Sequence, residues 1–113
     1  MMTIYHNPRC SKSRAGLKYL EENHIEHEIR LYLNDKLSVE ELSELLKQTG
    51  LKAEDLVRKQ EDYYKKELKG KELSTKEWLQ VLAENPKLLQ RPIIQKGNKA
   101  VLAQPPEKVE LLK

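Results

Sequence analysis

The sequence predicts an α/β protein built on a mixed sheet, and three observations carry that prediction. Residues 2–31 show strand, helix and strand patterns in turn, the middle of the chain carries two helix-capping sequences, and two apolar runs near the C-terminus flank a tight-turn signal. The chain has 113 residues, enough for one domain with its own hydrophobic core and too few for two ordinary domains.

The first element pattern covers the N-terminal part of the chain. Residues 2–6 predict a buried strand, residues 11–22 predict a helix, and residues 25–31 predict a second, half-buried strand. The expected packing positions of the helix are Ala15, Leu17, Tyr19 and Leu20, and those of the second strand are Ile25, His27, Ile29 and Leu31. Strand, helix and strand in this order make a βαβ unit, in which the two strands are parallel and the crossover is right-handed.

The middle of the chain predicts helices. Ser38 with Glu41, and Ser74 with Glu77, form capping boxes, and an apolar stripe follows each of them. The stretch between the two helices, residues 51–70, is expected to be helical in part. The middle of the chain is therefore a helical block.

The last third returns to strands. Residues 92–95 and 99–103 predict a hairpin, because Gly97-Asn98 between them is a tight-turn signal. A final helix is expected after Pro105-Pro106, packing through Val109, Leu111 and Leu112.

This order of elements indicates a fold type. A β-α-β unit, a helical block and a β-β-α unit together make the thioredoxin plan with an inserted helical segment. We therefore expect one thioredoxin-like domain over residues 1–113, with the insertion at about 35–90.

Cys10 is the only cysteine, and it lies at the turn between the first strand and the first helix. Ligands of open α/β sheets bind at such carboxyl ends of strands. The N-terminus of a helix presents unpaired N–H groups and partial positive charge, and such surroundings lower a cysteine pKa from about 8.5 to between about 3.5 and 7.5. Arg9, Lys12 and Arg14 add positive charge. The alternative to a reactive thiol is that Cys10 packs in the core as a small hydrophobic residue. If Cys10 is reactive, it has no second cysteine in the chain and must react with an external sulfur or an oxidised substrate.

Composition excludes several classes of protein. The 21 basic and 18 acidic side chains leave a net charge of only +3, spread too evenly to indicate nucleic-acid binding. No apolar run approaches the roughly 20 residues that span a bilayer. The single cysteine, and an N-terminus that enters a strand without room for a secretion signal, are typical of a cytoplasmic protein. His24 and His27 have no clustered carboxylate or thiolate, so no metal site is expected.

Four stretches of the sequence form a specific pattern when taken together. They are Tyr5-His6-Asn7-Pro8 with Cys10 and Ser13-Arg14, then Leu56-Val57-Arg58-Lys59, then Arg91-Pro92-Ile93, and finally Pro105-Pro106-Glu107-Lys108-Val109. Through them the chain resembles, over essentially its whole length, the glutaredoxin-linked arsenate reductases and their relatives of unassigned substrate.

The resemblance implies a thiol-dependent oxidoreductase with Cys10 as its nucleophile. Arg14, Arg58 and Arg91 would bind the arsenate oxyanion, and Pro92 would be a cis proline beside the cysteine. No cofactor is expected to stay bound. Because the chain has no second cysteine, glutathione would attack the arsenic adduct and glutaredoxin would then remove glutathione from Cys10.

Two further residues have supporting roles under this resemblance, and three positions depart from the reductase pattern. His6 and Ser13 are expected to support the thiol. Gln104 stands where the reductases carry a third arginine, and Ser11-Lys12 replaces their Gly-Thr. Loss of a charge-assisted hydrogen bond is worth about 1.5–3 kcal/mol, so an amide at position 104 would weaken oxyanion binding about ten- to a hundredfold.

Two other functions share this fold. The chain also resembles the Spx-type regulators, which bind RNA polymerase and carry a Cys-x-x-Cys redox switch at this turn. Here the turn reads Cys10-Ser11-Lys12-Ser13, so the switch is absent and only redox-independent binding of polymerase is open. The other alternative is a monothiol, glutathione-dependent reductase that acts on glutathionylated proteins.

Overall fold

A computed structural model describes residues 1–113, which divide into two compact units. Residues Met1–Asp35 and Arg91–Lys113 form the first unit, which contains the sheet, and Lys36–Gln90 form the second, which is helical. The second unit spans the stretch that the sequence analysis assigns to an insertion.

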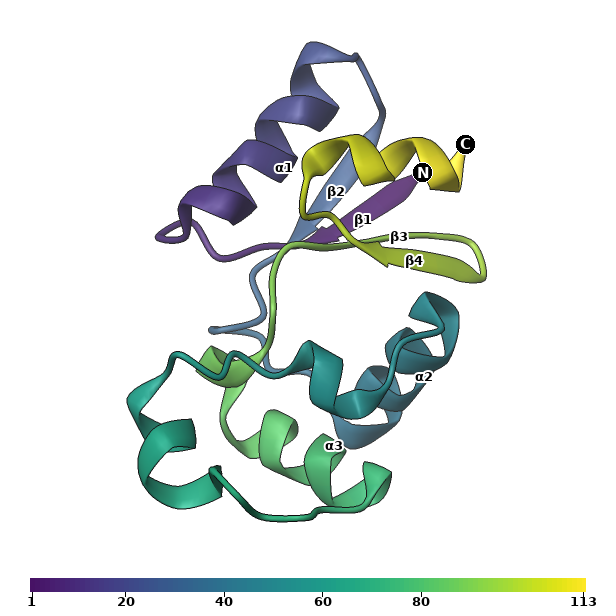
Figure 1. Ribbon diagram of the computed structural model, residues 1–113. Helices are drawn as coiled ribbons and strands as arrows, with labels where there is room; N and C mark the ends of the chain where they lie inside the picture. The colour runs from purple at the N-terminus through teal and green to yellow at the C-terminus, as the bar shows by residue number, and fades with distance from the viewer. The chain divides into compact units, whose positions relative to one another are not determined.

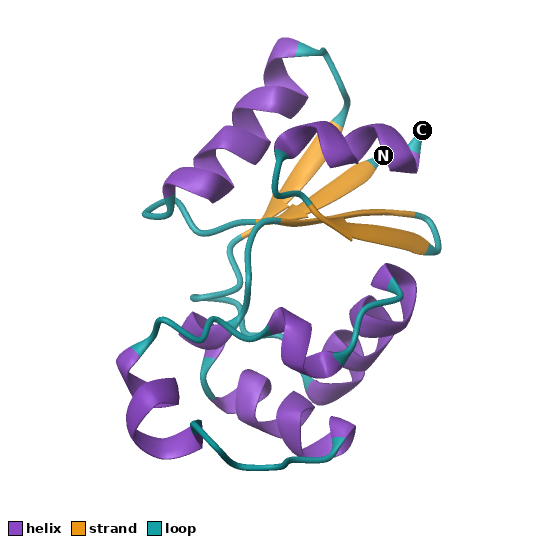
Figure 2. Ribbon diagram, in the orientation of Figure 1, coloured by secondary structure: helices purple, strands orange, loops and turns teal.

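The first unit is built on a four-stranded mixed sheet with the order β2-β1-β3-β4 (Figure 2). Its strands are β1 (Met2–Tyr5), β2 (His27–Arg30), β3 (Ile93–Lys96) and β4 (Lys99–Leu102). Strand β1 runs parallel to β2, with Ile4 opposite Ile29, and antiparallel to β3, with Ile4 opposite Ile94. Strands β3 and β4 form an antiparallel hairpin. The α/β class with a mixed sheet, the parallel first pair and the C-terminal hairpin are confirmed.

Two helices pack on the sheet in this unit (Figure 1). They are α1 (Ser11–Glu22) and η4 (Pro106–Leu112), a 3₁₀-helix at the C-terminus. The buried core of the unit consists of Met2, Ile4, Leu20, Ile94, Ala103, Val109 and Leu112. The core thus joins β1, β3, α1 and η4 and holds the start of α1 against the sheet.

The buried face of α1 differs from the expected one. Its buried residues are Ser13, Gly16 and Leu20, whereas Ala15 is exposed, so the prediction that Ala15 packs inward is wrong. The reason is a close approach at Gly16, where an added Cβ would lie 2.6 Å from Cγ of Pro92. The helix presents its glycine, rather than its alanine, to the proline.

Three apolar residues expected in the core are exposed. Ile29 is 48% exposed because β2 is an edge strand with a neighbour on one side only, and Leu31, which follows the end of β2, is 40% exposed. Leu111 is 68% exposed. A 3₁₀-helix has three residues per turn, so Val109 and Leu112 share the buried side and Leu111 lies off it.

The second unit contains α2 (Val39–Thr49) and α3 (Thr75–Glu84), which contact each other. Both capping boxes are confirmed, since Ser38 with Glu41 and Ser74 with Glu77 exchange reciprocal side-chain and backbone hydrogen bonds. Short helical turns complete the unit: η1 (Ala53–Leu56), the π-helix η2 (Tyr64–Leu68) and η3 (Pro86–Leu88). Residues 51–70 are therefore helical in part, as expected.

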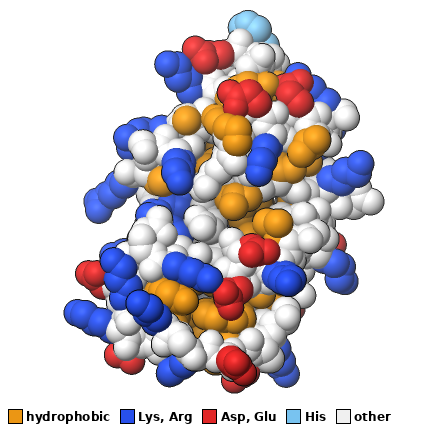
Figure 3. Space-filling model, viewed as in Figure 1, with side chains coloured by type: hydrophobic (Ala, Val, Ile, Leu, Met, Phe, Trp, Pro, Cys, Tyr) orange, Lys and Arg blue, Asp and Glu red, His pale blue; other side chains and the backbone are white.

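Charged side chains of both signs are interspersed over the face that Figure 3 shows. This distribution agrees with the nearly balanced composition of the chain. No helix of the structure combines the length and the apolar character that crossing a membrane requires.

Candidate active site around Cys10

Cys10 is the N-cap residue of α1 and has an extended backbone, with φ −96° and ψ 124°. Its N–H donates to the carbonyl of Asn7 (3.0 Å), and its own carbonyl accepts the N–H of Arg14 (3.0 Å), the first hydrogen bond of the helix. The residue is partly exposed. The alternative that Cys10 is a small hydrophobe sealed in the core is therefore excluded.

The surroundings of the Cys10 sulfur favour the thiolate. Partial burial by itself would raise the pKa of this thiol, but a hydrogen bond from the Arg91 side chain, the N–H groups of Ser13 and Lys12, and the charge of Arg91 together lower the pKa below its ordinary value. No hydrogen bond of ordinary cap geometry joins the side chain to the first turn. The two N–H groups therefore act on the sulfur mainly as dipoles of the helix end.

Arg91 reaches the sulfur from the segment that leads into β3. Its peptide bond to Pro92 is cis, which confirms the expectation for that proline. The segment that follows β4 holds it in place through two hydrogen bonds. The side-chain amide of Gln104 donates to the carbonyl of Arg91 (2.6 Å), and the N–H of Ala103 donates to the carbonyl of Pro92 (2.9 Å). Arg91 is buried, so its side chain has little freedom to move.

His6 and Ser13 form a buried hydrogen-bonded pair under the loop. The Ser13 hydroxyl accepts the N–H of Asn7 (2.9 Å) and lies 2.7 Å from Nδ1 of His6. Burial, followed by the charge of Arg14, lowers the pKa of His6, and the charge of Glu21 opposes this. His6 is therefore neutral at pH 7, and its Nδ1 shares a hydrogen bond with the Ser13 hydroxyl.

This pair supports the cysteine through the backbone. Ser13 contributes the N–H that lowers the pKa of Cys10, and its buried side chain anchors the loop of residues 6–9. His6 is not among the groups that shift the pKa of Cys10. His6 contacts Ser13, and a supporting role for His6 at the thiol stays a prediction.

The other two arginines have different surroundings. The Arg14 guanidinium donates to the carbonyl of Pro8 (2.9 Å) and so braces the loop beside Cys10. Arg58 belongs to the helical unit, where its Nε lies 3.4 Å from Oε2 of Glu61 without good hydrogen-bond alignment. Oxyanion binding by Arg14 and Arg58 stays a prediction.

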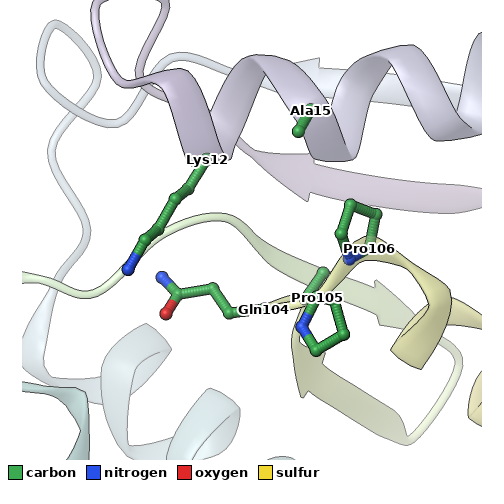
Figure 4. Close-up of a pocket in the computed structure, with 6 residues that line it drawn as sticks. Lys12, Ala15, Gln104, Pro105 and Pro106 are labelled. Carbon is green, nitrogen blue, oxygen red and sulfur yellow. The ribbon is translucent and has the colours of Figure 1, made fainter.

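A small cavity of about 210 Å³ adjoins the start of α1 (Figure 4). It is lined by Lys12, Ala15, Ala103, Gln104, Pro105 and Pro106. The sequence singled out Gln104 and Lys12 as departures from the reductase pattern, but it did not reveal that they share a cavity. Gly16 was also missed, although a glycine inside a predicted helix is a signal of close packing.

Comparison with known proteins assigns the family. The ArsC family matches residues 5–112 of the chain. The Escherichia coli (strain K12) protein YfgD is 45% identical over 108 residues, which are 94% of this chain and 91% of that protein. An arsenate reductase from Haemophilus influenzae is 40% identical over 108 residues, 94% of this chain and 93% of the relative.

The comparison also includes solved structures and more distant relatives. The structure of an arsenate reductase from Vibrio cholerae superposes with a TM-score of 0.93 at 39% identity, over 99% of this chain and 97% of that one. The transcriptional regulator Spx 1 of Bacillus cereus is more distant, 27% identical over 95 residues, which are 83% of this chain and 72% of the regulator. The chain, with its thioredoxin-like fold and its cysteine at the first turn, belongs to the ArsC family.

Proposed function

We propose that this protein is an arsenate reductase that works through the Cys10 thiolate. The observation that carries the proposal is the partly exposed Cys10 at the N-terminus of α1, where the Arg91 side chain and the helix N–H groups lower the pKa of the thiol. This arrangement supplies an ionised nucleophile and, next to it, a cation that can hold an oxyanion. Relatives of about 40% identity that are named arsenate reductases support it.

The proposed chemistry has three balanced steps. The thiol of Cys10 and arsenate form a sulfur–arsenic(V) bond with loss of one water. Glutathione then attacks the Cys10 sulfur, which releases arsenite and leaves a Cys10–glutathione disulfide, so arsenic gains the two electrons that the two sulfurs lose. Glutaredoxin removes glutathione from Cys10 by thiol–disulfide exchange and becomes glutathionylated itself.

Arg91 is the proposed primary oxyanion ligand, because it is already beside the attacking sulfur. A guanidinium holds two oxygens of a tetrahedral anion in bidentate fashion and stabilises the negative charge as the sulfur attacks. The resemblance assigns Arg14 and Arg58 to the same anion. Glutathione and glutaredoxin are proposed as reductants because Cys10 is the only cysteine of the chain.

The test is NADPH consumption coupled to glutathione reductase, glutaredoxin and glutathione, with arsenate as substrate. We expect wild type and the surface control Lys18→Gln to consume NADPH, and Cys10→Ser to show no arsenate-dependent rate. Arg91→Lys should lower kcat/KM for arsenate, by about tenfold or more, because the second donor of the guanidinium fork is lost. Arsenate reduction by Cys10→Ser would refute the mechanism.

A second candidate substrate follows from Gln104. Its amide carries no charge and its Nε2 is engaged with the carbonyl of Arg91, so it supplies no third cation for a doubly charged anion. This favours a glutathione mixed disulfide as substrate in place of arsenate, with Cys10 acting as a monothiol. If Gln104→Arg reduces arsenate and wild type does not, arsenate is not the native substrate of the protein.

A further inference from the structure

The cavity between the start of α1 and the segment after β4 has apolar walls, and the polar ends of Lys12 and Gln104 lie at its edge. Lys12 extends toward the Gln104 amide, and Ala15, Pro105 and Pro106 lie beside them (Figure 4). No hydrogen bond or ion pair within the protein holds the Lys12 ammonium. Gln104 uses Nε2 to bind the carbonyl of Arg91, which leaves Oε1 as an acceptor without a partner.

Two structural links, one along the backbone and one through hydrogen bonds, connect the lining of this cavity to Cys10. The N–H of Lys12 is one of the groups that stabilise the thiolate, so the cavity begins two residues along the helix from the sulfur. On the other wall, Gln104 binds the carbonyl of Arg91, whose guanidinium binds the same sulfur. A molecule with its sulfur at Cys10 therefore has the cavity within reach of its next few atoms.

The size and lining of the cavity restrict what fits. Its volume of about 210 Å³ is below the roughly 300–1,000 Å³ of sites that enclose a drug-sized ligand, so it holds one end of a molecule. The walls of Ala15, Ala103, Pro105 and Pro106 suit methylene groups. An inorganic oxyanion would leave these walls uncovered and would face the Gln104 Oε1 with another acceptor.

We infer that the cavity is a subsite for the carboxylate end of a peptide thiol or its disulfide, with Lys12 binding the carboxylate and Gln104 Oε1 accepting a peptide N–H. The inference rests on the proposed function, which supplies thiol chemistry at Cys10. The inference is tested with thiol–disulfide exchange, in which the Cys10 thiolate attacks one sulfur of a small disulfide. A sulfur–sulfur bond to Cys10 forms, the bond within the small disulfide breaks, and the other half of that disulfide leaves as a thiolate.

The experiment compares two disulfides. Cys10 of the full-length protein is reacted with glutathione disulfide, which carries carboxylates and peptide N–H groups, and with bis(2-hydroxyethyl) disulfide, which carries neither. Mass spectrometry follows formation of the mixed disulfide. The ratio of the two rate constants cancels changes in the reactivity of the thiol and reports recognition of the peptide part.

We expect Lys12→Gln to lower this ratio about tenfold, the effect of losing one charge-assisted hydrogen bond. The matched control Lys18→Gln removes the same charge from an exposed position of α1 outside the cavity and should keep the wild-type ratio. Glutathione disulfide esterified on its carboxylates should show the lower ratio with wild type and no further loss with Lys12→Gln.

Two results would overturn the inference. One is an unchanged ratio in Lys12→Gln, whether the two rate constants stay the same or fall equally. The other is an equal fall of the ratio in Lys18→Gln, which would indicate charge steering without a subsite. These outcomes are separate from failure of the proposed function. That failure would appear as absent arsenate reduction while the ratio still depends on Lys12.

Discussion

The side-chain amide of Gln104 donates a 2.6 Å hydrogen bond to the backbone carbonyl of Arg91, the residue whose guanidinium lies at the Cys10 sulfur. Gln104 precedes η4 and Arg91 precedes β3, so the bond ties the two chain segments beside the site together. The position of the guanidinium therefore depends on a residue that does not touch the sulfur itself.

Replacing Gln104 should change the reactivity of Cys10 from a distance. In Gln104→Leu the carbonyl of Arg91 loses its donor, the guanidinium is held less firmly, and the pKa of Cys10 should rise. The measurement is the rate of iodoacetamide alkylation against pH. Gln80→Leu, on the exposed face of α3, is the control and should leave the profile unchanged. An unshifted midpoint in Gln104→Leu would show that the hydrogen bond does not position Arg91.

Arg91 itself should have the larger effect on the thiol. Burial alone raises the pKa of Cys10, and Arg91 opposes it both as hydrogen-bond donor and as charge. Arg91→Met should therefore move the alkylation midpoint upward, by more than Gln104→Leu does, and Arg91→Lys should restore part of the shift. As a control, Arg9→Met removes an exposed cation from the loop just before Cys10 and should keep the wild-type midpoint. Equal midpoints in Arg91→Met and wild type would show that Arg91 does not lower the pKa of Cys10.

The sequence predicted those parts of the fold that depend on local pattern. The βαβ order, both capping boxes and the Gly97-Asn98 hairpin each need only neighbouring residues, and all are present. Exposure of Ile29 could not be predicted, because alternation of apolar residues does not reveal that a strand lies at the edge of a sheet.

At the site, the sequence alone indicated the type of chemistry but not the contacts. The placement of Cys10 at a helix N-terminus followed from the strand-turn-helix pattern. Arg91, which acts on the cysteine, and Gln104, which holds Arg91, both lie more than eighty residues from Cys10 along the chain, and no local pattern brings them together. Only the resemblance to a family pointed to Arg91, and nothing pointed to its contact with Gln104.

Gly16 should be intolerant of a side chain. A Cβ at this position would lie 2.6 Å from Cγ of Pro92, a ring atom that cannot rotate away. Gly16→Ala should therefore force α1 and the Pro92 segment apart, lower the free energy of unfolding by about 1–3 kcal/mol and slow alkylation of Cys10. Urea denaturation measures the first effect. Lys18→Ala, exposed on the same helix, is the control, and a fully stable Gly16→Ala would contradict the close approach.

Ser13 offers a matched comparison within one helical turn. Its hydroxyl is fully buried between the Asn7 N–H and His6, whereas the side chain of Ser11 is exposed. Ser13→Ala leaves both partners buried without a hydrogen bond, so it should cost about 1–3 kcal/mol of stability. Ser11→Ala should cost much less. Similar denaturation midpoints for the two variants would show that the buried hydroxyl contributes little to holding the loop.

The buried His6 should make stability depend on pH. Its pKa in the folded protein is below the unfolded value of 6.5, so the unfolded chain binds more protons in the window just below 6.5. Stability should therefore be complete above pH 6.5 and should fall as the pH decreases through that value, because protonation of His6 requires a charge to be buried.

The measurement is the free energy of unfolding in urea at about pH 7.5 and about pH 5.5. His6→Asn retains a polar side chain without a titrating ring, so its stability should fall less between the two pH values than that of wild type. His24→Asn is the control, because His24 is exposed and has a φ of 53°, a conformation that asparagine accepts. If His6→Asn loses as much stability as wild type and His24→Asn, the pH dependence arises elsewhere and the neutral form of His6 does not hold Ser13 in place.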